Sequence, residues 1–99
     1  MAGVTSATSL DEAGALLRAL AAPIRLALVD LLADGPRCVH ELVESCGASQ
    51  SLVSQHLRVL RGAQLVTSSR RGREIVYALT DTHVAHIVRD AITHVEEQR

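Results

Sequence analysis

The stretch "ASQSLVSQHLRVLRGAQLVTSSRRGREIVYAL" (residues 48–79) decides the fold predicted for this chain. Its first part predicts a helix from Gln50 to about Gly62, capped by Ser49, because apolar residues recur there at helical spacing. Two short runs rich in β-branched residues follow, "QLVTSS" and "EIVYAL", separated by "RRGR". Such runs on either side of a Gly-containing turn predict a β-hairpin. A helix followed directly by a hairpin is therefore expected.

The predicted helix has an apolar side and a polar side of unusual composition. The polar side carries short hydroxyls, amides and an arginine, which can hydrogen-bond base edges and phosphates, rather than the Glu and Lys of a merely solubilising face. The predicted buried stripe is Leu52, Val53, Leu57 and Leu60, and the predicted DNA-facing side chains are Gln50, Ser51, Ser54, Gln55 and Arg58.

Charge is distributed unevenly along the chain, although its formal net charge is only −1. No Asp or Glu lies between Ser45 and Arg73, yet five arginines fall in that interval. Three of them, Arg70, Arg71 and Arg73, surround Gly72 at the tip of the predicted hairpin. A basic segment inside a nearly neutral chain is typical of phosphate binding. We expect the hairpin to be a wing that places these arginines along a DNA backbone or in a minor groove.

The segments before this stretch predict three more helices. A short helix from Val39 to Cys46 ends at Gly47, so that it and the DNA-facing helix form a helix-turn-helix. Pro23 begins an earlier helix with Ile24, Leu28, Leu31 and Leu32 on its apolar side, and "DGP" at residues 34–36 ends it. Ser9 and Glu12 form a capping box for a first helix that runs to about Leu20, after a flexible segment 1–8.

The length of the chain predicts one domain. The order of the expected helices and hairpin makes residues 9–99 a mainly α winged helix-turn-helix with a β-hairpin wing. Tyr77 is the only aromatic residue, which argues against binding of single-stranded nucleic acid by base stacking. No apolar segment reaches the length of a membrane span, and residues 1–14 lack a signal-peptide pattern. The two cysteines are expected to stay reduced, so the predicted localisation is cytoplasmic. We expect neither a membrane partner nor a small organic ligand.

The C-terminal stretch "DTHVAHIVRDAITHVEE" (residues 81–97) carries metal-ligating residue types at both ends of one predicted helix. His83 and His94 point the same way but lie about 16 Å apart along the axis, too far to share one ion within a chain. If two copies pack antiparallel, Asp81 and His83 of one approach His94 and Glu97 of the other. Each homodimer then has two four-ligand sites that suit zinc. The alternative is that these histidines are solvated or capping.

From about Ser9 to Arg99 the chain resembles the bacterial ArsR/SmtB-type metalloregulators. The resemblance is carried by "ASQSLVSQHLRVLRGAQLV", "RRGREIVYAL" and "DTHVAHIVRDAITHVEE". It implies a homodimeric winged helix-turn-helix repressor, paired through its N- and C-terminal helices, whose metal-free form binds double-stranded operator DNA and loses affinity on metal binding. The last segment matches the inter-subunit zinc pattern of the zinc-sensing branch at Asp81, His83, His94 and Glu97.

A second metal site of the same family is matched only in part. Where thiolate-using members carry Cys-Val-Cys, this chain has Cys38-Val39-His40, followed by Glu41, and residues 1–14 lack the Cys or His that two-site zinc sensors add. We favour a buried thiol with His40 at a helix start, whereas His86, one turn after His83, is a candidate extra ligand. The rival functions are a nickel- or cobalt-responsive repressor, a Cys38-based thiol sensor and, in another class, a zinc enzyme, which a closed ligand shell disfavours.

Overall fold

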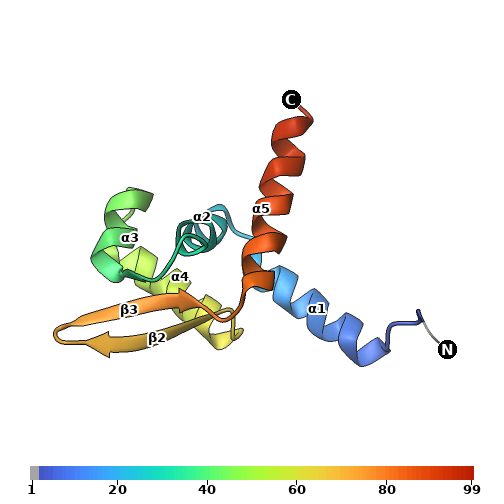
Figure 1. Cartoon of the computed structure of the whole chain (residues 1–99), viewed down its shortest axis with the longest axis horizontal. Helices are drawn as coiled ribbons and strands as arrows, with labels where there is room; N and C mark the ends of the chain where they lie inside the picture. Colours follow the sequence, from blue (N-terminus) through green and yellow to red (C-terminus); the bar gives the residue numbers. More distant parts are fainter. Residues whose placement is uncertain (1–2) are drawn as a thin grey trace.

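The computed structural model describes residues 3–99, which fold into a winged helix-turn-helix (Figure 1). Its three strands form one antiparallel sheet in the order β1-β3-β2. In chain order the elements are α1 (Ala7–Leu20), α2 (Pro23–Leu32), β1 (Arg37–Cys38), α3 (Val39–Cys46), α4 (Gln50–Gly62), β2 (Val66–Arg71), β3 (Glu74–Leu79) and α5 (Thr82–Glu97). Within residues 3–99, no helix combines the length and hydropathy that crossing a membrane requires.

Helix α1 begins earlier than the sequence pattern predicted. Ser6 is its N-cap, and the Ser6 hydroxyl accepts a hydrogen bond from the Ser9 amide at 3.1 Å. The capping box assigned to Ser9 and Glu12 is therefore wrong. Ser6 offers the same acceptor one turn earlier, and Ala7, the first residue of the helix, is a strong helix former. Of the segment predicted to be flexible, residues 1–2 lie outside the described part.

The core is aliphatic and lies where α2, α4, the base of the wing and the start of α5 meet. Pro23 occupies the first position of α2, as predicted, but Val29 is fully buried there while Ile24 and Leu31 are only half-buried. The most deeply buried side chains are Leu28, Val29, Leu42, Val53, Leu57, Leu60, Leu65 and Val88.

The helix-turn-helix has the predicted boundaries. Gly47 ends α3 in the left-handed conformation with φ 68°, and the Ser49 hydroxyl caps α4 by accepting from the Leu52 amide at 3.1 Å. The buried stripe of α4 is narrower than predicted, because Leu52 is 41% exposed. Val53, Leu57 and Leu60 recur at i, i+4 and i+7 and share one side, whereas Leu52 is turned about 100° from Val53.

The wing is the predicted hairpin, with one strand more than expected at its base. Strands β2 and β3 pair from Val66 opposite Leu79 to Arg71 opposite Glu74. Gly72 opens the two-residue turn with φ 62°, a conformation that favours glycine. The unpredicted strand β1 pairs with the other edge of β3, placing Cys38 opposite Val76.

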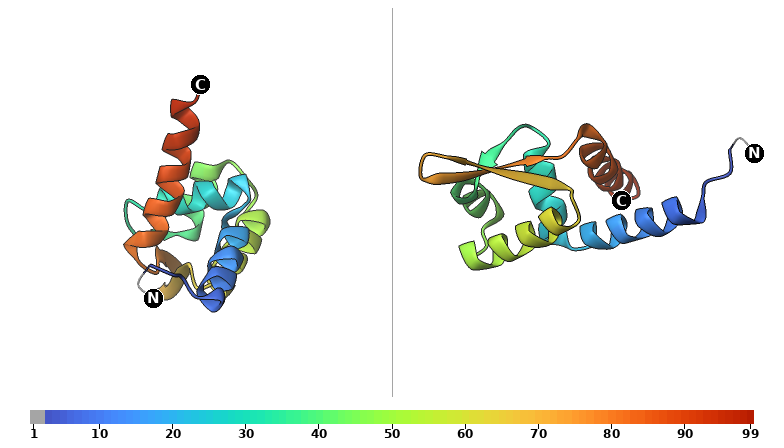
Figure 2. Two further views of the ribbon diagram at one scale, coloured as in Figure 1. Left: turned by 90° about the vertical axis from the view of Figure 1, so that its right-hand side faces the viewer. Right: turned by 90° about the horizontal axis from the view of Figure 1, so that it is seen from below.

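Helices α1 and α5 leave the body on the side away from the wing (Figures 1 and 2). Arg89 fixes α5 to α2: its Nε donates to Asp30 Oδ1 at 3.0 Å and its Nη2 to Asp34 Oδ1 at 3.0 Å. These two hydrogen bonds raise the pKa of Arg89 above its usual value. The orientation of α5 is thereby tied to the helix that supports the helix-turn-helix.

Candidate DNA-binding surface and candidate metal centres

The polar side of α4 faces solvent. The burial of Val53, Leu57 and Leu60 fixes the rotation of the helix, and the Ser49 cap fixes where it starts. Of the predicted DNA-facing side chains, only Ser54 is half-buried, and the exposed ones are Gln50, Ser51, Gln55 and Arg58. The structure thus gathers all five on the outer part of one short helix, with hydrogen-bonding groups available to an external partner.

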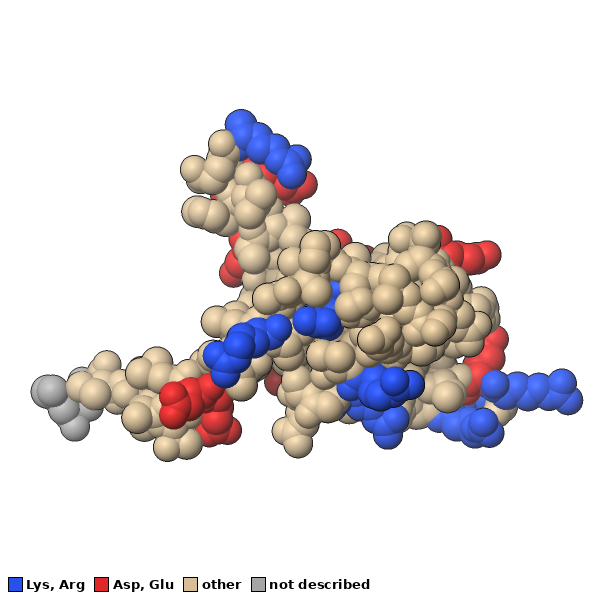
Figure 3. Space-filling model, turned by 180° about the vertical axis from the view of Figure 1, so that it is seen from behind, with Lys and Arg blue, Asp and Glu red and all other residues tan. Residues whose placement is uncertain are grey.

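The wing arginines are exposed as well. Arg70 and Arg71 lie on the last two residues of β2, and Arg73 lies in the turn. Figure 3 shows basic side chains gathered at the end of the wing and along the lower edge beside it, while acidic side chains are spread over the N-terminal helix, the upper part of the body and the C-terminal helix, with some next to the wing. The near-zero net charge therefore conceals a local concentration of arginines on α4 and the wing.

Arg25 connects α4 to the preceding helices. Its Nε donates to the carbonyl of Ala19 at 2.6 Å, and its Nη1 lies 3.1 Å from His56 Nδ1. Because this donor occupies Nδ1, His56 accepts there and is held against the body of the protein rather than turned to solvent. The contact helps to fix α4 against the body.

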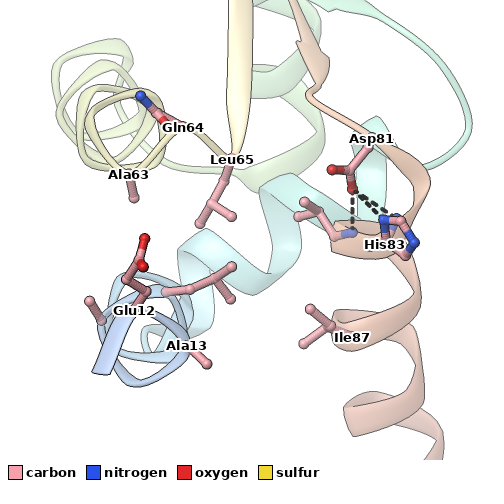
Figure 4. A pocket seen from close by; sticks show the side chains of 11 residues that line it. Glu12, Ala13, Ala63, Gln64, Leu65, Asp81, His83 and Ile87 are labelled. Carbon is pink, nitrogen blue, oxygen red and sulfur yellow. Dashed lines mark hydrogen bonds and ion pairs between the residues drawn. The ribbon is translucent and has the colours of Figure 1, made fainter. Parts of the chain in front are cut away.

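At the start of α5, Asp81 and His83 lie next to each other (Figure 4). Asp81 is the N-cap, and its Oδ1 accepts from the amides of His83 at 2.9 Å and Val84 at 3.3 Å. The Nδ1 of His83 is 3.4 Å from the same oxygen, and the His83 side chain is 85% exposed. The helix cap therefore holds this pair of candidate ligands together.

The other two candidate ligands, His94 and Glu97, lie on the last turns of α5 and are exposed. At about 1.5 Å per residue, His94 is about 16 Å along the helix from His83. One chain therefore brings the four predicted ligands together as two separate pairs rather than as one site. Ile87, 37% exposed, lies between the pairs on the same side of the helix.

Apolar surface adjoins these pairs. A groove of about 140 Å³ between α1 and α5 is lined by Leu17, Leu20, Ala21, Leu26, Ile87, Val88 and Ala91. A larger pocket of about 460 Å³ separates α1 from residues 63–65, which join α4 to β2, and from the start of α5 (Figure 4). Its lining includes Glu12 on one side and His83 on the other. On α1, Leu10 is 60% exposed and Leu17 is 53% exposed. Helices α1 and α5 therefore carry exposed apolar side chains beside the candidate ligands.

A third group of candidate ligands was not predicted as a group. The Sγ of Cys38 lies 3.3 Å from His40 Nδ1, and that nitrogen is 3.5 Å from Glu74 Oε1. One ligand atom from each of the three residues lies within 4.8 Å of the others. Sequence reasoning missed Glu74, because only the pairing of β1 with β3 brings it close, and a two-residue strand leaves no periodic signal.

Glu41 also contacts Cys38. Its Oε1 accepts from the Cys38 thiol at 2.9 Å and from the Cys38 amide at 3.0 Å. The thiol hydrogen bond raises the pKa of Cys38, to which burial adds, and lowers the pKa of Glu41. The other cysteine, Cys46, has its pKa raised by burial. Cys38 is therefore a buried thiol, as predicted, but one with three polar neighbours.

Residues 22–68 match the model of the family described as bacterial regulatory protein, arsR family. The matched segment runs from the residue before α2 into β2, so it contains the helix-turn-helix and ends before α5. The family model therefore bears on the helix-turn-helix and the start of the wing, and it does not test the candidate ligands on α5.

Two curated relatives extend the likeness to most of the chain. The chain is 57% identical over 88 residues to the HTH-type transcriptional repressor SmtB of Mycobacterium tuberculosis, an alignment that covers 89% of this chain and 65% of that protein. It is 48% identical to the HTH-type transcriptional regulator NmtR of the same organism, over 86% of this chain and 71% of that protein. The chain thus spans slightly less than two thirds of the SmtB repressor.

A solved structure supports the same fold. The homodimeric winged helix-turn-helix DNA-binding domain (fragment 1-100) of Mb0332 from Mycobacterium bovis superposes with a TM-score of 0.82 at 30% identity, covering 99% of this chain and 93% of that one. The predicted fold class is thereby confirmed. The matched proteins are regulators of transcription, not enzymes.

Proposed function

Because the chain belongs to the ArsR family of bacterial regulatory proteins, we propose that it is a metal-responsive transcriptional repressor. In this proposal residues 9–99 act as one DNA-binding and dimerisation domain. The metal-free homodimer binds double-stranded operator DNA, and zinc binding at the dimer interface releases it. The observation that carries the metal response is the division of four ligand-type side chains into two pairs at opposite ends of one exposed side of α5.

DNA recognition is assigned to α4 and the wing. In a helix-turn-helix the second helix lies in the major groove and its N-terminal residues contact bases. Here those residues are Gln50, Ser51, Ser54 and Gln55, with Arg58 one turn later. The exposed wing arginines are assigned to phosphates, which carry no sequence information, or to the minor groove, which separates only A·T from G·C pairs.

Dimerisation is assigned to α1 and α5. Both helices leave the body, and the exposed leucines of α1 together with Ile87 and Val95 of α5 present apolar side chains that the chain itself does not cover. A second copy is the partner favoured by the symmetry of the ligand pattern, because an antiparallel pairing of two α5 helices brings each start against the other's end. The apolar groove between α1 and α5 extends this surface.

The donor set of each inter-subunit site fits zinc. Asp81 and His83 from one subunit, with His94 and Glu97 from the other, supply two imidazoles and two carboxylates, a closed four-ligand shell. In one chain the cap already holds Asp81 near His83 through Oδ1, which leaves Oδ2 as the atom for an ion. Bound zinc would supply a cross-link between the subunits, with two sites in each dimer.

Release of DNA follows from coupling between the two ends of the molecule. Arg89 joins α5 to Asp30 and Asp34 of the α2 region, so a change in the angle between the two α5 helices moves the helix-turn-helix with it. Two recognition helices must match successive major grooves, about 34 Å apart. A dimer geometry that zinc favours and DNA does not would lower DNA affinity, and DNA would lower zinc affinity by the same factor.

The test is a metal titration on selected DNA. A duplex that the metal-free protein binds would be enriched from a random pool, and its equilibrium dissociation constant measured with zinc, nickel, cobalt and cadmium. We expect zinc to raise that constant at least about fivefold, the lower end of typical allosteric coupling. An unchanged constant with all four metals, in protein shown to bind them, would contradict a metal-responsive repressor.

A nickel- or cobalt-responsive repressor is the second candidate. It is favoured by the exposure of His86, which follows His83 by three residues on α5 and offers a fifth ligand. Nickel and cobalt accept more than four ligands, whereas structural zinc sites are tetrahedral. The same titration separates the two candidates by which metal releases DNA, and His86→Ala should weaken the response only in the second.

A further inference from the structure

Leu52 is an apolar residue in the first turn of α4 that the fold leaves at the surface. It is the third residue of the helix, and its amide donates to the Ser49 hydroxyl at 3.1 Å, so the cap fixes its place along the axis. The next residue, Val53, is fully buried, whereas Leu52 is 41% exposed. The three buried residues of α4 set its rotation, so Leu52 cannot turn into the core without exposing one of them.

The usual roles of a residue at a helix start do not account for this leucine. Leu52 occupies position N3, where a capping box has Glu or Gln, because those side chains can accept a hydrogen bond from the amide of the cap residue. A hydrophobic staple would use the following position, N4, which here is the buried Val53. Among residues 3–99, the hydrophobic core does not include Leu52 either. Its apolar surface is therefore available to an external partner.

The surroundings of Leu52 indicate which partner that is. Gln55 follows Leu52 by three residues, lies about 60° from it around the helix, and is exposed as well. A single exposed leucine elsewhere on a protein surface needs no explanation. Leu52, however, borders the polar side of α4 within the turns that a helix-turn-helix presents to base edges. A helix that brings Gln55 to the bases therefore carries Leu52 into the same groove.

Resting on the DNA-binding role proposed for α4, we propose that Leu52 contacts the C5-methyl group of a thymine in the major groove. That methyl is the only one that the four base pairs present there, and leucine has no donor or acceptor with which to read the other groups. The contact removes apolar surface of both partners from water, which is favourable. Opposite a cytosine, Leu52 would instead cover the N4 amino group, which would lose water without gaining an acceptor. Leu52 therefore selects thymine.

Deoxyuridine isolates this contact, because it lacks the C5-methyl group of thymidine and keeps every hydrogen-bonding group. In a duplex enriched by the metal-free protein, each thymine would be replaced singly by deoxyuridine, and the equilibrium dissociation constant measured. We expect one thymine in each half-site at which the replacement weakens binding about fourfold, the factor for burying one methyl-sized group. Leu52→Ala should bind the thymine duplex at least about fourfold more weakly than the unmodified protein. On this variant the replacement should have less than about a twofold effect, the scatter expected of independent changes.

Val59→Ala is the matched control. Val59 is also 41% exposed and follows Leu52 by seven residues on the same side of α4, but it lies beyond the first two turns. This variant should keep the full effect of the deoxyuridine replacement. An effect that is absent from every thymine, or that persists undiminished in Leu52→Ala, would overturn the thymine contact and leave the DNA-binding role of α4 intact. Failure of the unmodified protein to enrich any duplex would overturn both.

Discussion

Two regions of this molecule carry their candidate residues in different ways. The DNA-facing half, as we call it, comprises α3, α4 and the wing, and the α5 half comprises α1 and α5. In the first half, one continuous stretch forms α4 and the wing, and all eight predicted contact residues lie together in a single chain. In the second, two pairs of ligand-type residues occupy opposite ends of α5 and cannot meet within that chain. The comparison teaches that a sequence pattern can gather all candidate residues of a site within one chain only where that site lies in one continuous stretch. An inter-subunit site also needs a symmetry argument, which one chain does not test.

The largest expected effect concerns the two ends of α5. In the proposed site, His83→Ala or His94→Ala removes one of four ligands, so each variant should lose its zinc-dependent release of DNA. Zinc affinity should fall at least about 100-fold, the upper end for loss of a group that supports a metal. DNA binding by the metal-free variants should be retained, because neither histidine belongs to the DNA-facing half. Isothermal titration with zinc and an equilibrium DNA-binding assay measure both.

A mixture of these two variants tests whether the ligands come from different subunits. In a heterodimer of the His83→Ala and His94→Ala chains, one site lacks both histidines, and the other combines the remaining His83 with the remaining His94. The heterodimer should therefore bind one zinc ion with the affinity of the unmodified protein. If a purified heterodimer binds zinc no better than its parents, α5 does not pair as proposed, and the contrast between the two halves disappears.

The next largest effect concerns base recognition by α4. Ser54→Ala together with Gln55→Ala removes hydroxyl and amide groups that we assign to base edges. Each good base contact contributes about 1–3 kcal/mol of discrimination, so the preferred sequence should change at defined positions. Selection of binding sites from random duplexes, for both proteins, measures this directly. An unchanged preferred sequence would mean that recognition lies outside the first two turns of α4.

Most of the fold followed from local patterns, and the differences have identifiable causes. The boundaries of α3 and α4 were predictable because Gly47 and Ser49 are strong end signals. The apolar residue Leu52 was assigned to the core because apolarity alone does not fix the rotation of a helix, and packing turned it outward. The start of α1 differed because Ser6 and Ser9 are equivalent as caps in sequence.

The candidate sites differ in the same way. The polar residues of α4 and the wing arginines were predicted from their own segment, and in the structure all of them are exposed except Ser54, which is half-buried. Glu74 was missed because its neighbours Cys38 and His40 are distant in sequence, and only β1 connects them. The pairing of α5 ends stays a prediction, since it depends on a second copy of the chain.

A smaller effect is expected for the wing. Replacing Arg70, Arg71 or Arg73 singly with Ala should weaken binding to all duplexes by a similar factor, because phosphate contacts do not read sequence. The plot of log affinity against log salt concentration should become shallower by about 0.9 for each lost phosphate contact. Fluorescence anisotropy at several salt concentrations measures the slope. Arg99→Ala, just beyond the C-terminal end of α5, is the matched control that should leave the slope unchanged. A loss confined to one base position would instead assign that arginine to base recognition.

The smallest effect concerns the two N-caps, one in each half. Ser49 and Asp81 are both N-caps: the Ser49 hydroxyl accepts a hydrogen bond from the Leu52 amide, and Asp81 Oδ1 accepts hydrogen bonds from the amides of His83 and Val84. Ser49→Ala and Asp81→Ala should each lower the free energy of unfolding of the metal-free protein by about 1 kcal/mol. For a chain of this size that corresponds to a melting temperature about 4–8 °C lower. The melting temperatures are compared at equal protein concentration, because the stability of a dimer depends on concentration.

Asp81→Ser separates the cap from the proposed ligand. Serine and aspartate are about equally good N-caps. This variant should therefore keep the free energy of unfolding of the metal-free protein within about 0.5 kcal/mol of that of the unmodified protein. It lacks the carboxylate, however, and should lose zinc affinity as strongly as Asp81→Ala does. Calorimetric melting without metal, followed by zinc titration, gives both quantities for each variant. If Asp81→Ser keeps full zinc affinity, Asp81 is only a cap, and the fourth ligand must come from another residue near the interface, with His86 the first to test. If Asp81→Ser loses zinc affinity but not stability, Asp81 is a metal ligand as well as the N-cap of α5, whereas Ser49 is only the N-cap of α4.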